Sequence, residues 1–203
     1  MHLRWWLVGV IMIICLGPAG GNRLAAEAEN PTQRVQFLLK TINSIKPSNN
    51  GNLSAAEQAS NAAATKTANA LLDVRGVSQW ALGKYWDART PAEQQEFVTL
   101  LEQLFAKIAF PKSAEFFGDL TVTVKSERIT GPRAVVKTTV RHPKEGLVSI
   151  DYQLNQQDSN WIIRDILLDD VSLAGNLRSQ FLKVIAENSY AELLRRMREK
   201  LAE

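Results

Sequence analysis

Hydrophobic residues recur every three or four positions in the first half of the chain, which is the spacing of one helix face. This pattern predicts helices over residues 31–45, 53–72 and 77–86, the second of them only weakly amphipathic. A longer helix is predicted to begin after Thr90, which opens a capping box followed by proline at the first helical position. Pro111 is expected to end that helix.

After Asp119 the hydrophobic period changes to two, as in half-buried strands. Strands are predicted over residues 120–124, 134–140, 148–154 and 161–168, joined by short links rich in turn-forming residues. Short links place consecutive strands side by side, so a four-stranded, twisted antiparallel meander is expected. The alternation implies one covered face and one wetter face.

Helical spacing returns near the C-terminus, first from Leu177 to Ile185 and then after a second capping box at Ser189. Helices, a meander and again helices predict an α+β fold. We expect a single domain over residues 29–203, with an apolar pocket between the sheet and the helices.

The N-terminus resembles a secretory signal, with cleavage expected after Ala28. His2 and Arg4 precede an uncharged apolar run that ends at Leu16 and is too short to span a bilayer. Residues 26–28 (Ala-Glu-Ala) have the small-x-small pattern of a cleavage site. The alternatives are an uncleaved anchor, or cleavage after Ala19 or Ala26.

Lipidation at Cys15 is not expected, because Ile14 stands where a lipoprotein signal has a small residue. Cleavage would leave roughly 175 residues without cysteine, which excludes disulfides and thiol chemistry. The whole chain has 24 Lys and Arg and 21 Asp and Glu, and loss of Arg4, Arg23 and Glu27 leaves 22 and 20. This balance argues against nucleic-acid binding, and no second apolar run approaches membrane-spanning length, so a soluble mature protein without stable membrane insertion is expected.

Groups suited to catalysis are scarce. His142, at a predicted hairpin, is the one histidine of the mature chain, and no His/Cys cluster has metal-ligand spacing. We therefore predict no metal, no cofactor and no enzymatic activity. Asp165 and the Asp169-Asp170 pair remain as candidates: a buried carboxylate could act as a general base, whereas a solvated strand end would have no such role.

Several segments, in order, resemble the MlaC family of periplasmic phospholipid-binding proteins, also called toluene-tolerance auxiliary proteins. They are Val77–Trp86, Thr90–Phe97, Val148–Leu154, Trp161–Asp165, Val171–Phe181 and Leu193–Leu201. The chain departs from the family pattern at Leu177, where tyrosine is usual, at residues 168–170 and at residues 72–74.

The resemblance implies a periplasmic lipid carrier. Its ligand would be a phospholipid, or a hopanoid-like lipid as in some relatives. Its transient partners would be an outer-membrane lipoprotein complex and an inner-membrane ABC transporter, in a system that maintains outer-membrane lipid asymmetry. The residues expected to hold the lipid tails are Leu101, Phe105, Val136, Val140, Val148, Ile150, Tyr152, Trp161, Ile163, Leu173, Leu177 and Phe181.

Asn176 and Arg178 are expected at the pocket mouth or in a structural contact, such as an ion pair between Arg178 and Asp170. Two other functions stay open from the sequence. One is an enzyme of the cone-shaped α+β type that uses Asp165. The other is an envelope adaptor with a fully packed core, which would have no cavity for an acyl chain.

Overall fold

The computed structural model describes residues 30–46, 53–118 and 120–203. The predicted export signal lies outside these ranges. Of the helices within them, none combines the length and the hydropathy that a membrane span requires.

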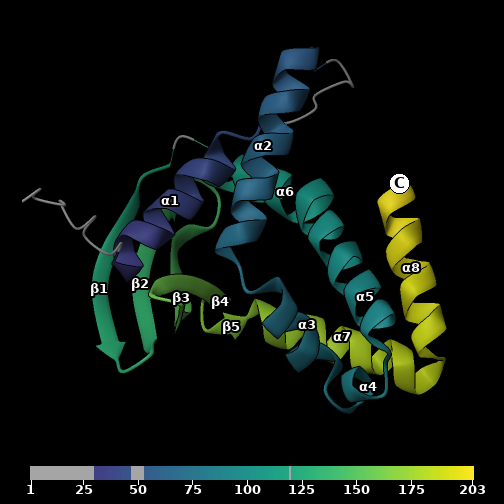
Figure 1. Ribbon diagram of the computed structural model, residues 1–203. Coiled ribbons are helices and arrows are strands. Elements are labelled where there is room, and N and C mark those ends of the chain that lie inside the picture. The colour runs from purple at the N-terminus through teal and green to yellow at the C-terminus, as the bar shows by residue number, and fades with distance from the viewer. Residues whose placement is uncertain (1–29, 47–52, 119) are drawn as a thin grey trace, which may run out of the picture.

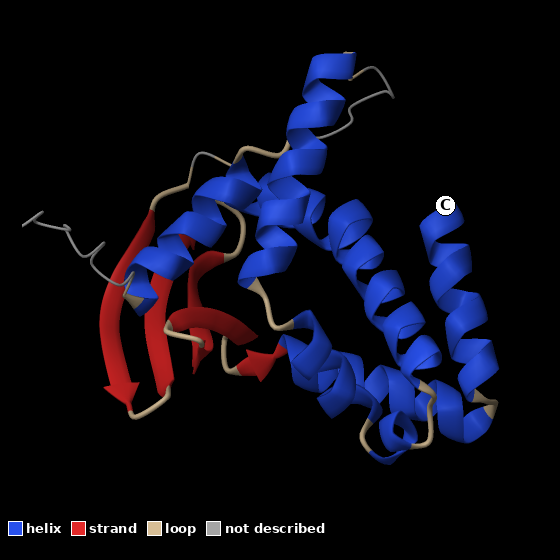
Figure 2. Ribbon diagram, viewed as in Figure 1, coloured by secondary structure: helices blue, strands red, loops and turns tan. Residues whose placement is uncertain are grey.

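The strands form one antiparallel sheet in chain order, which confirms the α+β meander (Figure 2). The strands are β1 (Val122–Thr130), β2 (Arg133–His142), β3 (Gly146–Gln157), β4 (Asn160–Leu168) and β5 (Val171–Ser172). The first strand begins two residues later than predicted, and the short fifth strand was not predicted. It forms because Asp169 and Asp170 both have positive φ, 44° and 66°, so the chain reverses in two residues and Leu168 pairs with Val171.

Three helices cover the inner face of the sheet and build the first hydrophobic cluster. Helix α1 (Pro31–Asn43) lies across the strands, with α2 (Ala55–Leu71) and α6 (Phe110–Phe117) packed against it (Figure 1). The sheet contributes the inward side chains of β2, β3 and β4, including Val136, Ile150 and Tyr152, each at most 1% exposed. We call this group the sheet cluster.

The remaining helices form a second cluster beyond the end of the sheet, in which α5 and α8 run side by side (Figure 1). We call it the helical cluster. Its helices are α3 (Val74–Leu82), α4 (Lys84–Asp87), α5 (Pro91–Leu104), α7 (Leu173–Glu187) and α8 (Tyr190–Ala202). The single helix predicted over residues 77–86 is therefore two helices, separated at Gly83, whose φ of 52° and ψ of −128° favour glycine.

The helix that follows Thr90 does not end at Pro111, contrary to the prediction. It passes through a π-helical turn, η2 (Phe105–Ala109), directly into α6. The amide of Phe110 donates to the carbonyl of Phe105, five residues back. Pro111 has no amide to donate, and it directly follows the π turn, where the regular i to i−4 hydrogen-bond pattern is already interrupted. Leu72 and Phe105 pack against both clusters and mark the place where they meet.

Candidate functional site

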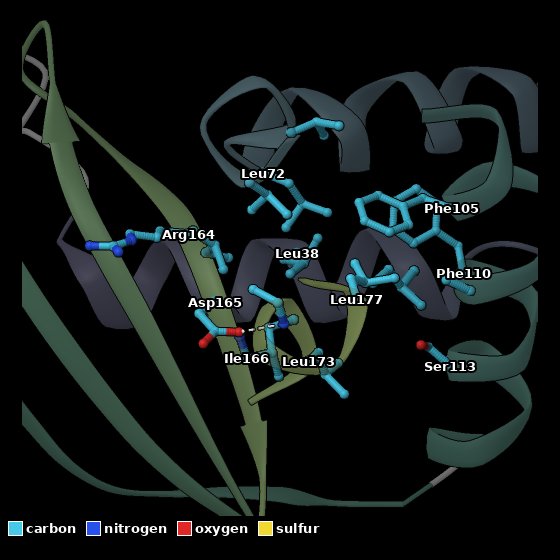
Figure 3. Close-up of a pocket in the computed structure, with 16 residues that line it drawn as sticks. Leu38, Leu72, Phe105, Phe110, Ser113, Arg164, Asp165, Ile166, Leu173 and Leu177 are labelled. Atoms are coloured by element: carbon cyan, nitrogen blue, oxygen red, sulfur yellow. Dashed lines mark hydrogen bonds between the residues drawn. The ribbon is translucent and has the colours of Figure 1, made fainter. Parts of the chain in front are cut away.

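An apolar cavity of about 130 Å³ lies where the two clusters meet (Figure 3). Helix α1 closes one side and β4 another, and α3, η2, α6, α7 and Leu72 contribute the rest. The side chains that line it are mostly aliphatic or aromatic: Leu38, Ile42, Leu72, Val74, Val77, Phe105, Phe110, Ile163, Ile166, Leu173 and Leu177. We call this space the junction cavity.

A second cavity of about 210 Å³ continues from the first toward the sheet. Both cavities are bounded by Leu38, Ile42, Ser113, Ile166 and Leu173, so they adjoin. The second, which we call the sheet cavity, extends between α6 and the inner face of the strands. Its border includes the exposed residues Lys112, Leu168 and Leu173, so this cavity opens to solvent there.

The sheet wall of this space is electrically neutral. Burial raises the pKa of the Tyr152 hydroxyl well above the usual tyrosine range, while its hydrogen bond with Thr138 acts weakly in the opposite direction. Thr138 in turn donates to the carbonyl of Ile150 at 2.9 Å. Tyr152 therefore stays protonated at physiological pH, and the wall presents apolar surface with its polar groups satisfied.

Asp165 fixes the connection between β4 and α7 that closes the cavities. One carboxylate oxygen accepts the Ser172 hydroxyl at 2.5 Å, and the other accepts the amides of Ile166 at 2.8 Å and Ala174 at 3.0 Å. Ser172, the N-cap of α7, accepts the amide of Gly175 at 2.8 Å. The carboxylate thus anchors the start of α7, and with it Leu173, against the strand.

Comparisons with known proteins identify the family. The family model described as MlaC protein matches residues 33–199. This chain belongs to the MlaC family. A search of curated proteins found no match to it.

A solved structure shares the MlaC-family fold of this chain. It is a phospholipid-binding protein from Ralstonia solanacearum, determined in complex with a phospholipid, and it is 23% identical. The likeness covers 84% of this chain and 94% of the other, with a TM-score of 0.68. At this level of identity the likeness shows a common fold.

Half of the residues expected to hold lipid tails border the cavities of this MlaC-family chain. Phe105, Ile163, Leu173 and Leu177 line the junction cavity, and Ile150, Tyr152 and again Leu173 line the sheet cavity. The other six lie in the packed clusters: Val136, Val140, Val148 and Trp161 in the sheet cluster, and Leu101 and Phe181 in the helical cluster.

The polar residues singled out in the sequence have structural contacts. Arg178 donates to the carbonyl of Trp80 and lies over its indole ring, 5.1 Å from the centroid, rather than pairing with Asp170. Asn176 is exposed on α7. Within the described ranges, no three His, Cys, Asp or Glu residues are grouped so that they could hold a metal ion.

Sequence reasoning missed the cavity walls contributed by α1 and by the end of β4. Leu38 and Ile42 were recognised as one face of a helix, but that pattern gives no sign of what the face contacts. Ile166 was missed because a bulge opposite Gln153 and Leu154 shifts the register of β4.

Proposed function

We propose that this MlaC-family chain is a periplasmic lipid carrier, which holds the acyl chains of a phospholipid in the junction and sheet cavities. It would move the lipid between an outer-membrane lipoprotein complex and an inner-membrane ABC transporter. The observation that carries the proposal is the pair of adjoining, mostly apolar cavities, the second of which opens to solvent beside Lys112. The phospholipid complex of a protein with the same fold supports it.

The energetics explain why such a carrier is needed. Transfer of a methylene from an apolar medium to water costs about 0.8 kcal/mol, so two ordinary acyl chains cost on the order of 25 kcal/mol. A lipid therefore does not cross water freely. A protein cavity need only replace water by apolar walls, and a headgroup left in solvent requires few polar contacts.

Two observations favour a carrier over the other functions considered. Both carboxylate oxygens of Asp165 already accept hydrogen bonds that hold α7, which gives this residue an anchoring role rather than that of a general base. The cavities distinguish the chain from an adaptor with a fully packed core. The predicted export signal agrees with work in the periplasm.

The proposal is tested by purifying the chain from cells without detergent and analysing extracted lipid by mass spectrometry. Uptake of phospholipid from vesicles provides a second measurement. We expect the wild type to carry phospholipid, and Ala109→Trp to lose it, because Ala109 lines the junction cavity and the indole would fill that space.

Ala106→Trp is the matched control. Ala106 lies in the same π-helical turn but borders a separate polar groove, with Asn69 and Lys107. Lipid uptake by this variant should equal that of the wild type. A wild type that carries no lipid and extracts none from vesicles, or equal loss in both variants, would contradict the proposal.

A further inference from the structure

Two polar side chains interrupt the apolar lining next to the opening. Lys112 and Ser113 are neighbours in the first turn of α6. Lys112 is exposed and borders the sheet cavity, where it is the one charged side chain among the described lining residues. Ser113 borders both cavities, and Figure 3 shows its hydroxyl oxygen directed toward the cavity.

Neither side chain has a hydrogen bond or an ion pair within the part of the chain that the structure describes. Lys46 and Lys137 differ, because their ammonium groups each lie 2.9 Å from a carboxylate oxygen. Thr138, on β2, donates its hydroxyl to a backbone carbonyl. The donors of Lys112 and Ser113 are therefore available to a ligand.

The Lys112 ammonium and the Ser113 hydroxyl suit different parts of a ligand. A lysine can lay its methylenes along an apolar wall and keep its ammonium in water, where three donors and a full charge suit an anionic oxygen such as that of phosphate. A serine hydroxyl in apolar surroundings suits a neutral acceptor such as an ester carbonyl. From solvent inward, the order is a cation, then a neutral donor, then hydrocarbon.

That order matches one class of lipid. A glycerophospholipid carries a phosphate at its head, ester carbonyls where the chains begin, and hydrocarbon beyond them. We propose that Lys112 binds the phosphate and Ser113 an ester carbonyl, so that these two residues select diacyl glycerophospholipids among lipids with the same tails. This inference rests on the proposed carrier function.

The other exposed residues that border the sheet cavity bear on the direction from which a lipid approaches. Leu168 and Leu173 are 36% and 38% exposed there, and the Asp169-Asp170 turn follows Leu168 directly. Carboxylates repel a phosphate, whereas the leucines offer apolar contact to the chains. The headgroup should therefore lie on the α6 side of the opening, beside Lys112.

A competition experiment tests the role of Lys112. The purified full chain, freed of lipid, is incubated with vesicles that contain phosphatidylglycerol and diacylglycerol with identical acyl chains, and the bound lipids are measured by mass spectrometry. The wild type should favour phosphatidylglycerol. Lys112→Glu should reduce that preference about fivefold, the size expected for one favourable exposed ion pair, while diacylglycerol uptake persists. Lys66→Glu, the same charge change at an exposed lysine in the polar groove, should keep the preference.

A second comparison isolates Ser113. Phosphatidylglycerol with ester-linked chains competes with its ether-linked analogue, which lacks the carbonyls. The wild type should favour the ester form, and Ser113→Ala should bind the two forms equally. An unchanged lipid preference in Lys112→Glu or Ser113→Ala, or equal loss in Lys66→Glu, would overturn the inference while the carrier function stands. Uptake of neither lipid by the wild type would overturn the carrier function, and this inference with it.

Discussion

The ring of Phe116 stacks on the imidazole of His142, with the planes 2° apart and the centroids separated by 4.8 Å. The same imidazole closes the turn between β2 and β3, since its Nδ1 accepts the amides of Lys144 at 3.2 Å and Glu145 at 3.1 Å. One side chain thus joins the hairpin to α6, the helix that borders the opening of the sheet cavity.

Replacement of His142 should separate these two contributions. His142→Ala loses both the stacking and the turn acceptor, and we expect the free energy of unfolding to fall by about 1–2 kcal/mol. His142→Asn keeps a side-chain acceptor but not the ring, so its free energy of unfolding should fall by less than that of His142→Ala. Urea denaturation of both variants, and of Phe116→Leu, measures the effects. Equal stability of His142→Ala and the wild type would show that the stacking contributes nothing.

Loss of the Asp165 carboxylate should destabilise the fold rather than remove a chemical step. Asp165→Asn lacks the negative charge of the carboxylate that accepts the Ser172 hydroxyl and two amides. We therefore expect the free energy of unfolding to fall by about 2 kcal/mol. Asp151→Asn is the control, because Asp151 pairs with the largely exposed Lys137 and should lose less than about 1 kcal/mol. The prediction fails if the two variants are equally stable in urea.

Gly83 and Gly131 provide a matched pair for backbone strain. Both have positive φ, 52° and 56°, so alanine is strained at either position. At Gly83 a Cβ would also lie 3.0 Å from a guanidinium nitrogen of Arg178, whereas nothing lies within 4 Å at Gly131. We expect Gly83→Ala to lower the thermal midpoint more than Gly131→Ala, because the Arg178 guanidinium must also shift from its place over Trp80 by a few tenths of an ångström. The reverse order would contradict this reasoning.

Tyr190 should make the stability depend on pH in the alkaline range. Burial, helped by the nearby Glu93 carboxylate, raises the pKa of Tyr190 from 10.0 to about 12. Since the folded-state pKa is the higher one, this stabilisation is complete below pH 10 and is lost as the pH rises toward 12. The wild type should therefore lose more stability over this range than Tyr190→Phe, measured by urea denaturation at several pH values. Equal losses of stability in the wild type and in Tyr190→Phe would contradict the raised pKa of Tyr190.

The sequence predicted the meander well because its turns are local. The link at residues 157–160 is short and polar, and the alternation on either side places the buried face, as Ile150 and Tyr152 show. The helix boundaries were harder to predict. Pro111 gives the same sequence signal whether a helix ends or continues from a π turn, and Gly83 lies inside an apparently continuous hydrophobic pattern.

The site was only partly predictable for a different reason. Periodicity shows which side of an element is buried, but it does not show which cluster that side joins. Leu101 and Phe105 are four residues apart and so share one face of the helix predicted after Thr90, yet Leu101 is buried in the helical cluster whereas Phe105 reaches the junction cavity. Leu38 was not among the residues expected to hold the lipid, and it borders both cavities. Whether a buried side chain packs in a cluster or borders a cavity depends on contacts between residues distant in the chain.

The π turn explains how one helical rod contributes to two clusters. Helix α5 buries Phe97 and Leu101 in the helical cluster, and α6 buries Phe110 and Phe117 in the sheet cluster. One extra residue in a helix rotates everything after it by about 100°. The number of residues in segment 105–109 therefore constrains the protein more than their identities do: a one-residue deletion there would turn every later side chain of the rod, whereas most substitutions would change a single wall contact.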